Sequence, residues 1–126
     1  MKRLLLDTHT LIWWDDDCLP RRVTTAIQNA DAVFVSAVTA WEIAIKTRAG
    51  KLTFEPQFLS DFDASIRSLA FEPLPIVSAH AVAAGALRGS HKDPFDRMLA
   101  AQAQVEGLTL VTADSRIAGL GVPVLW

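Results

Sequence analysis

Short, largely apolar runs are the feature that most constrains what this chain can fold into. They cover residues 4–6, 33–35 and 108–111, and each is followed by a polar residue. Runs of this kind indicate strands buried on both faces, because a strand with one face in water alternates apolar and polar side chains. Helical patterns separate the runs, so the sequence predicts an α/β fold with a mainly parallel sheet covered by helices on both faces.

The segments between these runs carry the spacing of amphipathic helices. Val38, Trp41 and Ile45 form an apolar stripe that predicts a helix over residues 37–49, which Gly50 ends. A second stripe predicts one further helix, and its members are Phe58, Phe62, Ile66 and Leu69. Further helices are predicted over residues 10–14, 78–89, 93–106 and 115–120, and Pro20 opens another. The remaining predicted strands cover residues 74–77 and 122–125.

Length and composition predict a single domain over residues 1–126 with its own core. The hydrophobic content of 51% is far above that of disordered chains. The one cysteine excludes an intramolecular disulfide and fits a reducing, cytoplasmic compartment. Asp7 interrupts the apolar start too early for a signal peptide, and no apolar segment is long enough to span a membrane.

Four acidic residues fall where an open parallel sheet binds its ligands, outside the carboxyl ends of the strands. Asp7 and Asp114 follow predicted strands, while Glu42 and Asp96 lie early in predicted helices. If these positions share one sheet edge, four carboxylates converge, and they need a cation because like charges repel. Oxygen ligands of this type suit Mg²⁺ or Mn²⁺, which predicts metal-assisted hydrolysis of a phosphodiester.

Charge alone does not indicate a nucleic-acid partner. The chain has 12 basic and 14 acidic residues, a net charge of −2. Without the four candidate acids, the same 12 basic residues would face 10 acids and the net charge would be +2. If the four acids gather in one site, the overall balance gives a misleading picture of the remaining surface.

Each acid also has a structural interpretation. Glu42 could close a capping box with Thr39 three residues earlier, and Asp96 lies near the third helical position, where a carboxylate favours the helix dipole. Asp114 could be a turn residue or a helix cap. Asp93 is best explained as the N-cap before Pro94 and is kept outside the metal site.

The four acids lie in four sequence blocks that together resemble PIN-domain ribonucleases, in particular the VapC-type toxins of toxin–antitoxin pairs. The blocks are LLLDTH at 4–9, SAVTAWEI at 36–43, HKDPFDRMLAAQA at 91–103 and LVTAD at 110–114. The resemblance covers residues 2 to about 125, in matching order. It implies a PIN-like, three-layer α/β/α sandwich and a metal-dependent endoribonuclease with an acidic site.

The resemblance also implies roles for individual residues. Asp7 and Asp96 are expected to bind the metal directly, whereas Glu42 and Asp114 are expected to orient waters or hold a second ion. Thr112 matches a polar position near the metal waters. The expected cofactor is Mg²⁺, with Mn²⁺ possible, and the expected partners are RNA, an antitoxin protein that occupies the acidic groove, and a second copy of the chain.

Basic and aromatic side chains near the acids are candidates for substrate contacts. An RNA backbone needs cations beside an acidic centre, and four residues qualify: Lys46, Lys92, Arg97 and Arg116. Each could instead belong to a solvated surface, and Arg97 could pair with Asp96. His9 and His91 could contact phosphate, while Trp13, Trp14 and Trp41 could stack on bases or lie in the core or an interface.

Other classes of protein fit the sequence less well. A receiver-type phosphoacceptor domain needs an acid pair after its first strand, where Asp7 stands alone, and a haloacid-dehalogenase-type phosphatase needs an Asp at the position of His9. Glycine-rich nucleotide loops are absent from the sequence. The serious alternative is a catalytically inactive PIN-fold protein that binds RNA or a partner protein.

Overall fold

A computed structural model, which describes residues 2–126, confirms the parallel sheet. Its five strands run in the order β3-β2-β1-β4-β5, and every neighbouring pair is parallel. The strands are β1 (Arg3–Leu6), β2 (Ala32–Ser36), β3 (Glu72–Leu74), β4 (Thr109–Val111) and β5 (Val124–Leu125). The apolar runs therefore form the three central strands, as their continuous hydrophobic character predicted.

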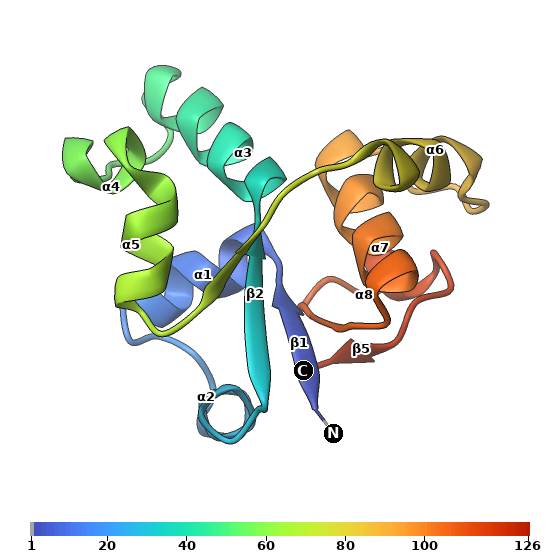
Figure 1. Cartoon of the computed structure of the whole chain (residues 1–126), viewed down its shortest axis with the longest axis horizontal. Helices are drawn as coiled ribbons and strands as arrows, with labels where there is room; N and C mark the ends of the chain where they lie inside the picture. The colour runs from blue at the N-terminus through green and yellow to red at the C-terminus, as the bar shows by residue number, and fades with distance from the viewer. Residues whose placement is uncertain (1) are drawn as a thin grey trace.

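Helices cover both faces of the sheet, as the sequence predicts. Figure 1 shows α1, α2 and α5 on one side of the strands and α6, α7 and α8 on the other. The eight helices of the described chain are α1 (Thr8–Asp15), α2 (Arg21–Gln28), α3 (Ala37–Arg48), α4 (Pro56–Ser60), α5 (Phe62–Ser68), α6 (Ser78–Ala86), α7 (Pro94–Glu106) and α8 (Ser115–Ala118). The result is a three-layer α/β/α arrangement.

The central strand β1 contributes to two separate cores. Leu4 and Leu6 pack with side chains of α1, α2 and α5, while Leu5 between them packs with side chains of α7 and α8. All three leucines are fully buried. Successive side chains of a strand point to opposite faces, so one Leu-Leu-Leu run serves both layers of helices.

The predicted single helix across residues 58–69 is wrong in one respect, because the chain forms two helices there. Asp61 takes a non-helical conformation and caps α5, accepting a hydrogen bond from the Ala64 amide at 3.2 Å. The apolar spacing nevertheless continues across the break, since the rings of Phe58 and Phe62 pack edge to face with centroids 5.7 Å apart. The break was therefore invisible to a periodicity argument.

The apolar stripe predicted for α3 is also wrong about which side faces inward. Of the predicted stripe, Val38 is buried as expected, but Trp41 is 58% exposed and Ile45 is exposed as well. The rest of the buried face carries Thr39, Glu42 and Ile43. The helix turns polar residues inward because that face borders the acidic edge of the sheet. Trp41 packs instead on the surface, edge to face against Phe95 with centroids 5.1 Å apart.

Two smaller boundaries differ from the predictions. The strand predicted over residues 74–77 is β3, which ends at Leu74, directly before Pro75, and Ser78 is the first residue of α6 rather than its cap. Asp93 caps α7 as predicted, and Gly107 ends that helix with a φ of 69°. Throughout residues 2–126, no helix combines the length and apolar character needed to cross a membrane.

Candidate metal centre at the carboxyl edge of the sheet

Asp7 is a buried carboxylate at the point where β1 meets α1. Its amide donates to the Val111 carbonyl at 3.1 Å, which ties the end of β1 to β4. Its Oδ1 caps α1 by accepting from the Thr10 amide at 2.8 Å, yet the residue is only 6% exposed. Within residues 2–126, Asp7 forms no ion pair, so one helix cap is its only direct compensation for burial.

Glu42 reaches the same edge from the buried face of α3. One carboxylate oxygen accepts a hydrogen bond from the Thr8 hydroxyl at 2.6 Å, and the other lies 2.5 Å from the Lys46 ammonium. Ser36 caps this helix, which places Glu42 well inside it and excludes the capping box with Thr39. The Thr39 hydroxyl instead lies 3.2 Å from that of Thr8.

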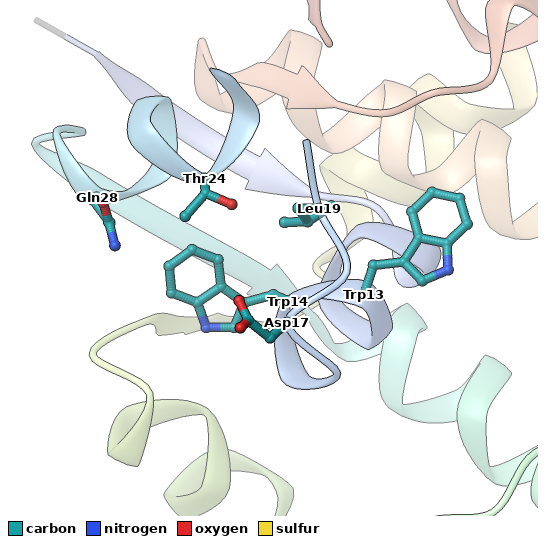
Figure 2. Close-up of a pocket in the computed structure, with 6 residues that line it drawn as sticks. All are labelled: Trp13, Trp14, Asp17, Leu19, Thr24 and Gln28. Carbon is teal, nitrogen blue, oxygen red and sulfur yellow. The ribbon is translucent and has the colours of Figure 1, made fainter. Parts of the chain in front are cut away.

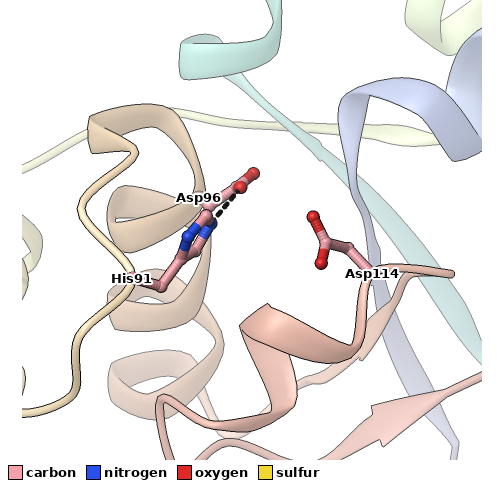
Figure 3. Close-up of side chains that lie close together, drawn as sticks. All are labelled: His91, Asp96 and Asp114. Atoms are coloured by element: carbon pink, nitrogen blue, oxygen red, sulfur yellow. Dashed lines mark hydrogen bonds and ion pairs between the residues drawn. The ribbon is translucent and has the colours of Figure 1, made fainter.

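Asp96 lies in the first turn of α7 and shares a hydrogen bond of 2.6 Å with His91 Nε2 (Figure 3). Burial raises the pKa of the Asp96 carboxyl above its ordinary value of 3.8, and the negative charges of Asp93 and Glu42 act in the same direction. The hydrogen bond from His91 opposes this rise. Asp96 is therefore a carboxylate whose charge the surrounding residues only partly compensate.

Asp114 caps α8 and is held by Arg116. It accepts from the Arg116 amide at 2.9 Å and from the guanidinium through both carboxylate oxygens, at 3.0 and 2.7 Å. These hydrogen bonds lower the pKa of Asp114 to about 2. The buried Thr112 hydroxyl accepts from the Asp114 amide at 3.0 Å and so fixes the turn that presents this acid.

The four acids that the sequence singled out line one hollow of about 240 Å³. Figure 3 shows the Asp114 carboxylate facing Asp96 across a gap, and ligand atoms of His91, Asp96 and Asp114 all lie within 4.8 Å of one another. This donor set consists mainly of carboxylate oxygens, which are the ligands that Mg²⁺ and Mn²⁺ prefer. The chemistry of the site therefore fits a divalent cation.

The predicted basic side chains lie in different places relative to this hollow. Lys46 and Arg116 line it, each paired with one of the acids. Lys92 borders a neighbouring hollow of about 460 Å³ together with His91 and Arg116. Arg97 lines neither of these two hollows. Its guanidinium donates to the carbonyls of Leu87 and His91. The alternative pair of Arg97 with Asp96 does not form among residues 2–126, whereas the substrate contact stays a prediction. The hydrogen bonds of Arg97 hold the loop that carries His91.

Sequence reasoning missed two side chains that contact the acids. Thr8 was quoted only as part of a block, yet its hydroxyl positions Glu42. His91 was considered only as a phosphate contact, yet it binds Asp96. The five-residue separation of His91 and Asp96 spans a loop and a helix cap, so no helical spacing reveals the contact.

Replacing Arg116 with glutamine is expected to raise the pKa of Asp114 from about 2 towards 3.8. The lowered pKa of Asp114 stabilises the folded protein. This stabilisation is complete at pH values above 3.8, the ordinary pKa of the carboxyl, and is lost as the pH falls towards 2. Arg116→Gln removes that contribution. Carboxyl titration of the metal-free protein by NMR measures the shift, with Lys92→Gln as a control of equal charge change. An Asp114 pKa that stays near 2 in the Arg116→Gln protein contradicts the assignment.

Comparison with known proteins identifies the family. A family model described as the PIN domain matches residues 4–122. Ribonuclease VapC22 of Mycobacterium tuberculosis (strain ATCC 25618 / H37Rv) is 32% identical over 125 residues, which cover 93% of this chain and 91% of that protein. This sequence similarity extends over nearly the whole chain.

Solved structures share the fold at lower sequence identity. The DNA-bound VapBC of Salmonella typhimurium superposes with a TM-score of 0.73 at 22% identity, covering 99% of this chain and 98% of that one. FitAcB of Neisseria gonorrhoeae gives a TM-score of 0.69 at 21% identity, covering 98% and 96%. Fold, family model and sequence similarity agree, and the chain belongs to the PIN-domain family.

Proposed function

We propose that this protein is a metal-dependent endoribonuclease and the toxin component of a type II toxin–antitoxin pair. The observation that carries the proposal is the convergence of four carboxylates, from four separate segments of the chain, in one hollow at the carboxyl edge of a PIN-domain sheet. A buried group of like charges destabilises a fold unless a cation or a partner compensates for it. Hydrolysis of a phosphodiester is the chemistry that such a carboxylate-held cation supports best.

Asp7 and Asp96 would hold the ion directly, and Glu42 and Asp114 would act through water or a second ion. Mg²⁺ is the expected cofactor, with Mn²⁺ as a substitute. When bound, the ion supplies an activated water and stabilises the leaving oxygen. His91 orients the Asp96 carboxylate through its hydrogen bond, as groups around metal ligands commonly do.

The remaining polar residues would position the acids and bind the substrate backbone. Thr8 and Lys46 fix the two oxygens of Glu42, and Thr112 fixes the turn of Asp114. Lys46, Lys92 and Arg116 offer positive charge to the phosphates of an RNA backbone at the rim of the acidic hollow.

The proposed partners follow from the relatives. VapC22 is named a ribonuclease, and another structure that shares this fold is described as a toxin–antitoxin complex from Klebsiella pneumoniae. We expect a cognate antitoxin that covers the acidic groove, and a homodimer of this chain, acting in the cytoplasm. Residues 1–126 would then form a single PIN domain that carries the whole activity.

Incubating the purified, antitoxin-free protein with total RNA and Mg²⁺ tests the proposed function. Discrete RNA fragments are expected, because a shaped site around one scissile phosphate selects its substrate, while DNA of comparable size should stay intact. Gel electrophoresis and sequencing of the new RNA ends measure the outcome. RNA that is retained by the protein but never cut would favour the alternative, a catalytically inactive PIN-fold protein.

A further inference from the structure

We propose that a second hollow, beside the acidic one, binds the base of a nucleotide next to the scissile phosphate, with Trp13 as its stacking platform. This inference rests on the proposed function and specifies how the same site holds its substrate. The second hollow has a volume of about 410 Å³, and Trp13 forms its aromatic wall. We call it the aromatic hollow.

The aromatic hollow is continuous with the candidate metal centre. Asp7, His9, Asp114 and Arg116 line both hollows, so the two share one rim. A phosphodiester held at the acids must place one of its flanking nucleosides within a few ångströms. The shared rim makes the aromatic hollow the adjacent space that is open to that nucleoside.

Trp13 is half-buried and belongs to neither of the two core clusters of the described residues, although its ring touches that of Trp126, which packs on one of them. Figure 2 shows the rings of Trp13 and Trp14 on opposite sides of α1. Trp14 packs on Phe71, with ring centroids 5.4 Å apart, and belongs to the core on that face of the sheet. Of the two tryptophans, only Trp14 is therefore a member of this core, and the ring of Trp13 is available for another contact.

Neighbouring rings hold Trp13 in place. His9 lies four residues earlier on the same face of α1, with its ring centroid 5.7 Å from that of Trp13, and the Trp126 ring lies 5.8 Å away on another side. The Trp126 carbonyl in turn accepts a hydrogen bond from the Arg22 guanidinium. A ring fixed in this way loses little conformational freedom when it stacks on a ligand, which favours binding.

The chemistry of the aromatic hollow suits a nucleobase in particular. A flat aromatic ring stacks on any base, and Arg116 at the rim can face the phosphate that joins the two hollows. An acidic peptide segment would be repelled by Asp7 and Asp114 on the same rim. Stacking of a base beside the scissile phosphate accounts for both the aromatic wall and the guanidinium at its rim.

Binding of a random-sequence pool of short single-stranded RNA with a hydrolysis-resistant backbone, measured with Mg²⁺ in the protein with Asp96 intact, tests the inference. Adding Trp13→Leu is expected to weaken binding by about 5- to 150-fold, the range that loss of one base stack gives, whereas Trp13→Phe keeps an aromatic ring and should stay within about three-fold. Trp41→Leu removes an exposed ring outside the aromatic hollow and is expected to leave binding unchanged.

A ribose-phosphate polymer of the same length without bases separates stacking from phosphate binding. It should bind the parent, the Trp13→Leu and the Trp13→Phe proteins equally. Equal RNA binding by the Trp13→Leu protein and its parent, or no RNA binding by the parent, overturns the inference. Cleavage of total RNA by the protein with Asp96 intact tests the proposed function separately. If that protein cleaves RNA but Trp13→Leu leaves RNA binding unchanged, the role of the aromatic hollow is rejected and the proposed function stands.

Discussion

Replacing Asp96 with asparagine is expected to lower the rate of RNA cleavage by about 10²- to 10³-fold or more while the protein stays folded. Asparagine has nearly the same shape as aspartate but lacks the negative charge that a divalent cation requires. Asp96 is also central to the candidate metal centre, since it binds His91 and faces Asp114. Initial rates on total RNA at saturating Mg²⁺ measure the effect.

The same substitution is expected to stabilise the metal-free protein against unfolding. Because burial raises the pKa of Asp96, the folded state holds its proton more tightly than the unfolded state does. Charged Asp96 therefore costs stability as the pH rises through the folded pKa, and the cost persists at neutral pH. Asp96→Asn removes that cost, so its thermal midpoint in EDTA should exceed that of the parent at pH 7 and approach it in acid.

Asp93→Asn is the matched control for both measurements. It removes one negative charge three residues away on the same helix start, and asparagine caps a helix as well as aspartate does. Asp93 also lines the acidic hollow, but its carboxylate accepts the Asp96 amide as a helix cap and is not an expected metal ligand, so cleavage should stay within about three-fold of the parent rate. A loss of cleavage as large as that of Asp96→Asn would mean that charge at the helix start, and not a particular ligand, determines activity.

The parts of the fold that the sequence predicted well depend on short-range patterns. A continuous Leu-Leu-Leu run can be satisfied only by burial on both faces, and that fixes β1 as a central strand of a parallel sheet. Once β1 and β4 lie side by side, Asp7 and Asp114 must share an edge. The convergence of these two acids was thus predictable from strand ends, whereas that of Glu42 and Asp96 depended also on where their helices begin.

The parts that the sequence did not predict depend on contacts between distant segments. Trp41 and Ile45 satisfy an apolar stripe, but the acidic edge requires Thr39 and Glu42 to face inward, and one helix cannot present both faces to the interior. The Thr8 contact to Glu42 joins residues 34 positions apart. The inward face of α3 and the Thr8–Glu42 contact are both decided by the packing of α3 against α1 and the sheet. The local spacing of apolar residues carries no information about that packing.

Removing divalent metal is expected to abolish cleavage altogether, which is the largest effect of all. Without a cation, the acids repel both one another and an incoming phosphate, and no side chain of the acidic hollow can replace the ion. Lys46 and Arg116 are each paired with one acid, so their two charges do not also compensate Asp7 and Asp96. Restoring Mg²⁺ should therefore restore the activity in full.

The most direct test of the metal-dependent site is the rate of total-RNA cleavage by one protein preparation in Mg²⁺, in Mn²⁺, in EDTA, and in EDTA followed by excess Mg²⁺. We predict cleavage at the same RNA sites with either metal, none in EDTA, and recovery when Mg²⁺ is returned, all absent from the Asp96→Asn protein. Cleavage that continues unchanged in EDTA, or in the Asp96→Asn protein, would contradict the account.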